Sequence, residues 1–409
     1  MPGPLHGVKI VEMTSVVLGP WACQLLADMG AEVIKIEQPR GDSNRSLGAA
    51  NHPGMAALYL TCNRNKRSLV LDLRQSGARD ALLALVKDAD VFVHNNRPQV
   101  MTKLGIDYAD MKKVNPRIIF CGAYGYSKKG PYGALGALDD SIQAVSGIAM
   151  LNEMVLGEPR YLPTIVADKT TALTVVYGVL GALFHRERTG EGQELEVPMF
   201  ETMVHWVMAE HLWGMTFEPP KGKPGYVRLM SHHRKPYRTL DGYIAILPYL
   251  DAHWEKFCNL TGRAELVKDP LFVKLADRVR NIDDTYRITG EIMATRTTGE
   301  WLKVFDKSGV PIIVVNSLED LAKDPHLLET GFWQFVDHPT EGRLRMPSFP
   351  VNYSATPASI HRHAPRLGEH TVEVLREAGL SVEQIEALTA SGAAMTAEQA
   401  AGTVAEGGD

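Results

Sequence analysis

The chain has 409 residues, of which 45% are hydrophobic and 22% are charged, and its formal net charge is −5. This composition is typical of a globular protein that is long enough for two domains. The negative net charge argues against a nucleic-acid partner. No stretch approaches the roughly 20 apolar residues of a membrane-spanning helix.

The first two hundred residues alternate short apolar runs with segments of helical periodicity. Helices are predicted at 21–29 and 78–87, and strands are predicted at 8–12, 33–37, 68–73, 91–93 and 118–121. This alternation predicts parallel βαβ units and an α/β, doubly wound, Rossmann-like sheet. Ligands bind at the carboxyl ends of the strands of such a sheet. We therefore expect one crevice to be surrounded by the loops after residues 12, 37, 73, 93 and 121.

A long helix at 168–186 and a strand at 194–197 follow, and the composition then shifts at 218–224 (EPPKGKP), which cannot form regular structure. From residue 237 the chain has its own pattern, with a strand, a turn at Asp241-Gly242 and several amphipathic helices. The stretch 393–409 is rich in Ala, Gly and Glu, which predicts a disordered tail. The predicted order is a large domain that includes 1–217, a linker at 218–236, a smaller α/β domain at 237–325, a segment at 326–392 that returns to the large domain, and the tail.

The usual cofactor motifs are missing from the sequence. The loop after the first predicted strand reads TSVVLGP from Thr14 to Pro20, without G-x-G-x-x-G, which argues against a nicotinamide or flavin cofactor. Walker-type, H-E-x-x-H and G-x-S-x-G motifs are also absent. The four scattered cysteines and the absence of a signal-peptide pattern predict reduced, mostly buried thiols in a cytoplasmic protein. We therefore expect no tightly bound cofactor and no metal.

Basic residues gather near the predicted strand ends. Several cations at one rim could bind a polyphosphate ligand through charge-assisted hydrogen bonds. The alternative is a solvated surface with scattered ion pairs, and spacing alone does not decide between them. The set consists of Lys35, Arg40, Arg45, residues 63–67 (NRNKR), Arg97 and Lys103.

Asp168 stands immediately before the long apolar helix, in the segment TIVADKTT. The simplest interpretation is a helix cap, which contributes about 1 kcal/mol. Alternatively, the helix dipole and free N–H groups could keep the carboxylate ionised and available as a nucleophile. Adjacent histidines point in different directions, so His232 and His233 do not indicate a metal pair. Roles for Asp139 and Asp140 stay open, with helix capping as the default.

Segments along nearly the whole chain carry a family resemblance. They include PLHGVKIVEM, LLADMGAEVIKIEQPRGDSNR, NRNKRSLVLDL, ADVFVHNNRP, NPRIIFCGAYGYSKKGPY, VADKTTAL, RTGEGQELEVPMFE, GVPIIVVNSLEDLAKDP and LGEHT. Each alone is weak, but so many in order resemble the family III CoA-transferases. This family includes the formyl-CoA:oxalate and carnitine CoA-transferases, and α-methylacyl-CoA racemase shares its fold.

The resemblance implies an interlocked homodimer and an aspartate nucleophile at Asp168 that carries CoA as an aspartyl-CoA thioester. Its substrates would be an acyl-CoA donor and a small carboxylic acid, with coenzyme A as substrate and not as a bound cofactor. The positions that would contact CoA are Val17, Leu18, Gln38, Leu71, Asp72, Leu73, Arg74, Asn95, Asn96, Arg97, Lys103 and Tyr124.

This sequence departs from the family pattern at two of these positions. Gln38 stands where relatives often have arginine, and Val17 stands where oxalate-using relatives have glutamine. The glycine-rich loop of those relatives is also not visible. These departures argue against oxalate as the acceptor.

Two alternatives to CoA transfer were weighed. The racemases pair the aspartate with a histidine, which would fall at Leu138, and leucine cannot exchange a proton. Transfer is therefore favoured over racemisation. The other alternative is a non-catalytic acyl-CoA-binding protein on the same scaffold, which would bind CoA esters without exchanging label between acid and ester.

Overall fold

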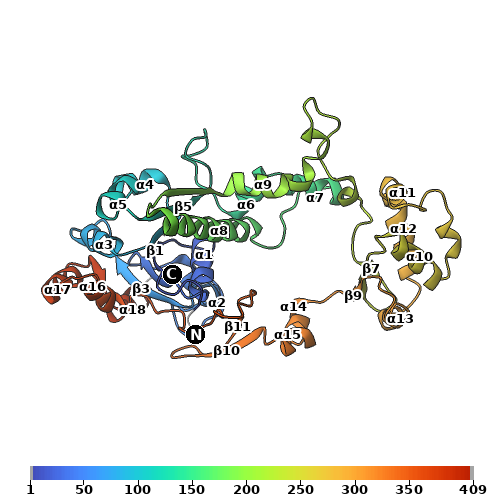
Figure 1. The fold of residues 1–409 in the computed structure, drawn as a ribbon. Helices are drawn as coiled ribbons and strands as arrows, with labels where there is room; N and C mark the ends of the chain where they lie inside the picture. The colour runs from blue at the N-terminus through green and yellow to red at the C-terminus, as the bar shows by residue number, and fades with distance from the viewer. Residues whose placement is uncertain (1–2, 406–409) are drawn as a thin grey trace. The chain divides into compact units, whose positions relative to one another are not determined.

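The computed structural model describes residues 3–405, which fold into two compact units. The large unit contains residues 3–146, 162–205 and 326–405, and the small unit contains residues 147–161 and 206–325 (Figure 1). The small unit therefore includes residues 147–161, before Asp168, and its longer segment begins at residue 206, whereas the sequence places the small domain at 237–325. Both the predicted domain and the observed unit end at residue 325.

A mainly parallel sheet forms the centre of the large unit. In the described part of the chain it has seven strands in the order β12-β3-β2-β1-β4-β5-β6, in which β1 to β6 run parallel and β12 runs antiparallel to β3. The α/β class and the large parallel sheet are thus confirmed. The strands are β1 (Lys9–Met13), β2 (Glu32–Glu37), β3 (Lys66–Leu71), β4 (Val91–His94), β5 (Ile119–Tyr124), β6 (Glu194–Pro198) and β12 (Ala394–Met395).

Helices cover both faces of this sheet. One face packs against α3, α4, α5, α16 and α17 in a core that contains Leu69, Leu82, Phe92 and Leu375. The alternate strand residues are buried as well, and α1 contacts β1, β2 and β4 while α8 contacts β5 and β6. The bounds in the large unit are α1 (Leu18–Asp28), α2 (Ala57–Cys62), α3 (Ala78–Lys87), α4 (Pro98–Leu104), α5 (Tyr108–Val114), α6 (Asp139–Val145), α8 (Val166–Thr189), α16 (Thr371–Glu377), α17 (Val382–Ala390) and α18 (Ala397–Ala405).

The helix α8 is apolar on two faces. Residues at helical spacing, such as Thr171, Val175 and Val179, are buried against the large unit, whereas Tyr177 and Phe184 are exposed. Its length and mean hydropathy of 1.2 would also allow it to cross a membrane, which we did not expect from the sequence. Because the buried face packs on α1 and on the sheet, α8 serves here as a core helix.

The predicted disordered tail is wrong for the part that the structure describes. Residues 394 and 395 form β12, which pairs with Leu71 and Val70 of β3, and α18 follows. Ala393 and Ala394 are fully buried, and the carbonyl of Ala393 accepts the Asp72 N–H at 2.9 Å. Small side chains therefore close the sheet edge instead of leaving the segment unpacked. Residues 406–409 lie outside the described residues.

The small unit has a separate core around Trp254, Phe257 and Trp301. Its described part contains an antiparallel sheet of β7 (Tyr237–Arg238), β8 (Tyr243–Ile246) and β9 (Ile312–Val314), with Asp241-Gly242 between β7 and β8. Its helices are α7 (Ile148–Leu156), α10 (Asp251–Leu260), α11 (Leu275–Arg280), α12 (Ile282–Met293), α13 (Thr298–Val304) and α14 (Leu318–Leu321).

The helices α9 and α15 lie at the boundaries of the units, and the strands β10 and β11 lie outside the two larger sheets. The predicted linker at 218–236 belongs to the small unit and contains a short 3₁₀ turn at Val227–Met230. The hairpin of β10 and β11 lies in the large unit. These remaining elements are α9 (Met199–His211), α15 (Pro325–Glu329), β10 (Trp333–His338) and β11 (Gly342–Pro347).

Candidate active site

A crevice lies at the carboxyl ends of the parallel strands, where the strand order reverses between β1 and β4. A cavity of about 320 Å³ opens there between the loops that follow β1, β2, β3 and β4. This is the position at which doubly wound sheets bind their ligands. The predicted crevice is therefore present, although the loop after β5 does not line it.

Seven of the twelve predicted CoA-contacting residues line this cavity. They are Gln38, Leu71, Asp72, Leu73, Arg74, Asn95 and Asn96. The cavity is mixed in character, since aliphatic side chains such as Leu71 and Leu104 face amides and the Asp72–Arg74 ion pair. It can therefore hold a ligand that carries both polar and apolar groups.

The other five lie elsewhere. Val17 and Leu18 are buried at the start of α1, so their side chains belong to the core. Arg97 and Lys103 are exposed at the start and in the last turn of α4. Tyr124 is buried at the end of β5, where its hydroxyl donates to Glu196 Oε1 at 2.8 Å.

The loop after β1 is held by side chains from β2 and from the loops that follow β2 and β4. Lys35 Nζ donates to the Thr14 carbonyl at 2.9 Å, and Asn95 both accepts the Ser15 N–H at 3.2 Å and donates to the Ser15 carbonyl at 2.8 Å. Asn96 Nδ2 donates to the Met13 carbonyl at 3.3 Å. The two asparagine side chains thus tie β4 to β1, in addition to lining the cavity.

Val16 in this loop has a φ of +68°, which a β-branched residue adopts only under constraint. Asp42 Oδ1 accepts its N–H at 3.1 Å, and Asn44 Nδ2 donates to its carbonyl. Because Asp42 and Asn44 are both buried, the loop is held in a conformation that its own sequence does not favour.

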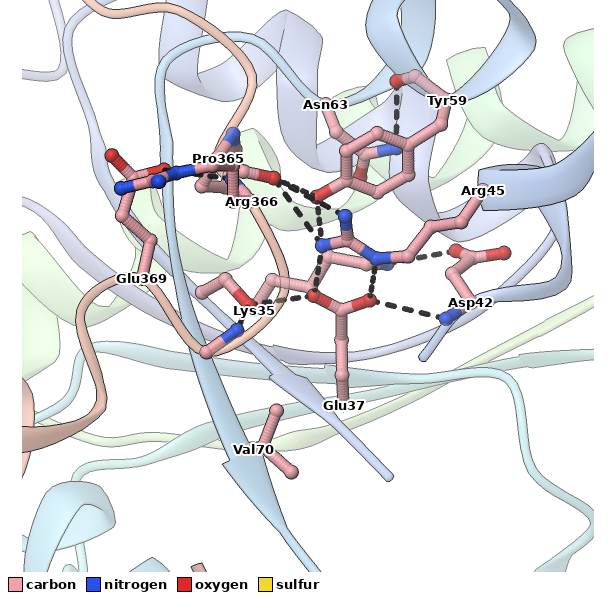
Figure 2. A network of polar contacts seen from close by, with 12 residues as sticks. Lys35, Glu37, Asp42, Arg45, Tyr59, Asn63, Val70, Pro365, Arg366 and Glu369 are labelled. Atoms are coloured by element: carbon pink, nitrogen blue, oxygen red, sulfur yellow. Dashed lines mark hydrogen bonds and ion pairs between the residues drawn. The ribbon is translucent and has the colours of Figure 1, made fainter. Parts of the chain in front are cut away.

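A buried network of charges holds the loop and the neighbouring strands (Figure 2). Lys35 lies 3.2 Å from Glu12 and 3.0 Å from Asp42, and Lys66 lies 2.7 Å from Glu12. Burial acts to raise the pKa of the Glu37 carboxyl. The guanidinium of Arg45, 2.7 Å away, outweighs this effect and holds the pKa at about 2.

Figure 2 shows the same guanidinium reaching the Tyr59 hydroxyl and the Pro365 carbonyl, at 2.6 and 3.3 Å. Tyr59 Oη in turn donates to the Pro365 carbonyl at 3.0 Å. This buried cluster thereby joins β2 to the chain segment that returns to the large unit from residue 326.

These contacts correct the prediction for the basic residues. Lys35, Arg45, Arg64, Lys66 and Arg67 are all buried and paired with carboxylates, so they form neither a polyphosphate rim nor a solvated surface. A buried ion pair holds its geometry because breaking it leaves an unpaired charge. Arg40, Arg74, Arg97 and Lys103 are exposed, and of these Arg74 lines the cavity.

Asp168 lies in the first turn of α8, and it is 8% exposed. It does not cap this helix: Asp139 Oδ1 accepts the N–H groups of Ala167 at 2.7 Å and of Asp168 at 3.0 Å. Within residues 3–405, no group donates a hydrogen bond to the Asp168 carboxylate. Burial, and secondarily the Asp139 carboxylate, raise the pKa of Asp168 to about 7.

Both expectations for Asp168 therefore need correction. The first role, a helix cap, belongs to Asp139. The second mechanism, ionisation promoted by the helix N-terminus, also fails because Asp139 occupies the N–H groups that would have provided it. The carboxylate of Asp168 is a desolvated, comparatively basic group.

Comparisons with known proteins agree with this architecture. The model of CoA-transferase family III matches residues 5–371. The acetyl-CoA:oxalate CoA-transferase of Acetobacter aceti is 33% identical, over 92% of this chain and 96% of its own. The succinyl-CoA:glutarate CoA-transferase of Homo sapiens is 29% identical, over 91% of this chain and 86% of its own. A crystal structure of a CaiB/BaiF family protein from Brucella suis has a TM-score of 0.78 and 30% identity, covering 92% of this chain and all of that one.

The chain belongs to CoA-transferase family III. The family consists of transferases that act on CoA thioesters, so the chain is a CoA-transferase and the predicted enzyme class is confirmed. Leu138, where a racemase histidine would fall, is 70% exposed and precedes α6 without contributing a titratable group. In the small unit, His232 Nδ1 lies 2.7 Å from the Val155 carbonyl, and no function is assigned to His232 or His233.

Sequence reasoning did not identify the partners of several residues around Asp168 and the crevice. Helix capping was the default expectation for Asp139, but the helix that it caps begins almost thirty residues later, so no local pattern indicates which helix that is. The roles of Asp42 and Asn44 were also missed. Both residues follow β2 in the sequence, whereas the loop that they hold follows β1.

Proposed function

We propose that the chain moves CoA from an acyl-CoA donor to a small carboxylic acid through a covalent thioester on Asp168. The observation that carries the proposal is the state of the Asp168 carboxylate, which is buried, receives no hydrogen bond within the described chain and has a pKa raised to about 7. A carboxylate in this state is about half ionised at neutral pH. It is also a stronger nucleophile than a solvated one, because basicity and nucleophilicity rise together.

The reaction would proceed through two covalent states of Asp168. A carboxylate oxygen attacks the acyl carbon of the donor, which forms the C–O bond of a mixed anhydride and breaks the C–S bond to release CoA thiolate. The thiolate then attacks the Asp168 carbonyl carbon, which forms the aspartyl-CoA thioester and expels the donor acid as its carboxylate. The acceptor carboxylate reverses these steps, attacking the thioester and then losing its acyl group to the thiolate. Each step exchanges one acyl bond for another, so no oxidant, reductant or net proton is required.

The crevice between β1 and β4 is the proposed site for the CoA moiety. Its support is the clustering of Gln38, Asn95, Asn96 and residues 71–74 around one cavity beside exposed cations. Arg74 and Arg97 would meet phosphate groups through charge-assisted hydrogen bonds. Because Asn95 already bonds both backbone groups of Ser15, we assign it to loop positioning and not to a direct amide contact with CoA.

The acceptor is proposed to be a small dicarboxylic acid. Support comes from the relatives, which are named for glutarate, succinate and oxalate acceptors or donors. Val17 stands where the oxalate-using relatives have glutamine, and Gln38 stands where relatives often have arginine, so we favour an acid longer than oxalate. A panel of dicarboxylic acids, incubated with succinyl-CoA and read by mass spectrometry, identifies it.

A homodimer is proposed as the working form. The exposed face of α8 carries Leu173, Tyr177 and Phe184, three large apolar residues on a helix that begins at the nucleophile. An apolar face of this kind is typical of a surface covered by a partner. Light scattering should give twice the 45.0 kDa mass of the chain, and a mass of one chain would contradict the dimer.

The nucleophile assignment is tested by Asp168→Ala. We expect transfer to fall by roughly 10³-fold or more, because the covalent route is lost, while acyl-CoA still binds in the crevice. Steady-state exchange of isotope between acid and CoA ester measures the first quantity, and calorimetry with acyl-CoA measures the second. The matched control is Asp140→Ala, which removes an exposed carboxylate near the same helix. Transfer at the wild-type rate in Asp168→Ala would refute the assignment.

A further inference from the structure

Asp139 is the charged side chain that the structure places against the nucleophile, and the reaction above gives it no role. It is buried at the first position of α6, although it is flanked by the exposed Leu138 and Asp140. Its Oδ1 accepts the N–H groups of Ala167 and Asp168, and its Oδ2 accepts Nε2 of Gln143 at 2.6 Å. A short acidic side chain on one helix thus caps the start of another.

Gln143 extends this contact along the segment that leads to the nucleophile. Its Oε1 accepts the N–H of Leu162 at 2.9 Å, and its Nε2 also donates to the Thr164 carbonyl at 3.3 Å. Asp139 and Gln143 therefore hold residues 162–168 through hydrogen bonds to four of them, all within the large unit. The position of the Asp168 side chain follows from these contacts, since they set the first turn of α8.

We propose that Asp139 is a positioning residue for the nucleophile Asp168. Asp139 occupies the N–H groups at the start of α8 and places a like charge beside Asp168. The acylated, uncharged form of Asp168 is favoured as a result. This inference rests on the proposed covalent role of Asp168 and adds the group that controls it. A carboxylate at the start of a helix would ordinarily accept these N–H groups and gain stability as an anion. Here Asp139 accepts these N–H groups, so they do not stabilise the anion of Asp168.

The like charge acts on the chemistry in one direction. While Asp168 is ionised, it is destabilised by burial and by repulsion from Asp139, as its raised pKa shows. Conversion of Asp168 to an anhydride or a thioester removes its charge and relieves both effects. Asp139 therefore lowers the free energy of the covalent states relative to that of the ionised carboxylate. It favours the protonated form of Asp168 for the same reason.

The groups packed around α8 show which charges can act on the Asp168 carboxylate. The elements packed against α8 are α1, α6, β5 and β6, and Lys169 follows Asp168 on α8 itself, where its Nζ donates to Thr164 Oγ1. Within residues 3–405, only Asp139 acts electrostatically on the Asp168 carboxylate. The titratable groups of those neighbouring elements are Cys23, Asp28, Asp139, Asp140, Cys121, Tyr124, Glu194 and Glu196.

The test compares Asp139→Asn, Asp139→Ala and the control Asp140→Asn in the full-length enzyme. The titration of Asp168 is followed by NMR of carboxyl-¹³C aspartate, with the resonance assigned through its absence in Asp168→Asn. This measurement needs neither substrate nor activity. Asp139→Asn keeps an oxygen acceptor for the two N–H groups, so it should fold and lose only the charge.

We expect the pKa of Asp168 to fall by about one unit in Asp139→Asn, a tenfold change in its proton affinity. It should fall further in Asp139→Ala, because the freed N–H groups can then donate to Asp168. The acid limb of the kcat profile should move in the same direction, and the steady-state fraction of hydroxylamine-sensitive protein should decrease. Asp140→Asn should leave all three readouts unchanged.

The inference would be overturned if the Asp168 titration in Asp139→Asn matched that of the wild-type enzyme. It would also be overturned if the titration moved while the kcat profile and the covalent fraction did not. Failure of the proposed function itself looks different, since Asp168→Ala would then retain transfer.

Discussion

The carboxylate of Asp168 differs from an ordinary surface aspartate in its affinity for a proton. Burial, and secondarily the Asp139 carboxylate, together raise its pKa from 3.8 to about 7. The same two causes make the ionised side chain unfavourable in the folded protein. The buried carboxylate that we propose as the nucleophile therefore destabilises the fold when it is ionised.

Replacement of Asp168 by asparagine should stabilise the protein at neutral and alkaline pH. Between about pH 4 and pH 7 the folded chain binds more protons at this position than the unfolded chain does, so stability falls as pH rises through this window. Above pH 7 the penalty is complete, at most about 4 kcal/mol for this shift. Asp168→Asn removes it.

Guanidinium unfolding of both proteins at pH 5 and pH 8 measures this effect. The stability advantage of Asp168→Asn should grow from pH 5 to pH 8. Equal stabilities at pH 8 would show that the ionised carboxylate is not destabilised in the fold.

Individual site residues could be predicted from the sequence only where a motif carried them. The family resemblance of VADKTTAL indicated Asp168 as a candidate. It did not indicate that Asp139 contacts the same helix start. Its capping role was misassigned because the competing cap, Asp139, comes from a separate helix. The basic residues at 35, 45 and 64–67 were misread for a related reason, since their carboxylate partners lie on other strands and helices.

At the scale of elements, the local patterns were sufficient for the parallel strands and for the helices α1, α3 and α8. The predicted helix at 78–87 has the observed bounds, because it is amphipathic and Gly77 precedes it in a left-handed conformation. Strand predictions differ from the observed bounds by one to three residues. The strand β12 escaped prediction, because its pairing with β3 joins residues more than three hundred positions apart.

Truncation after Gly392 should test the part that the C-terminal segment plays. It removes β12 and α18, exposes the edge of β3 and leaves the Asp72 N–H without the Ala393 carbonyl. We expect the free energy of unfolding to fall by about 2 kcal/mol or more, and KM for acyl-CoA to rise because Asp72 and its neighbours line the crevice.

The matched control is truncation after residue 405, which keeps both elements. Identical melting temperatures and KM values for the two truncated proteins would mean that β12 supports neither the sheet nor the crevice.

At the scale of the whole molecule, the large unit contains the crevice, Asp168 and the apolar face of α8. The α/β class could be predicted from strand and helix alternation. The end of the small unit at residue 325 coincides with the predicted one, but its other boundaries could not be predicted, because residues 147–161 join the small unit although they precede Asp168 in the chain. Composition marked only the Pro-rich turn at 218–224.

Mass spectrometry of the trapped intermediate tests the covalent role of Asp168 most directly. The wild-type enzyme is incubated with acyl-CoA, quenched with hydroxylamine and digested, with Asp168→Asn treated in parallel. We expect the peptide that contains residues 166–169 to carry a hydroxamate on Asp168, and only when acyl-CoA was present. Transfer activity accompanied by an unmodified Asp168 peptide would contradict the covalent mechanism.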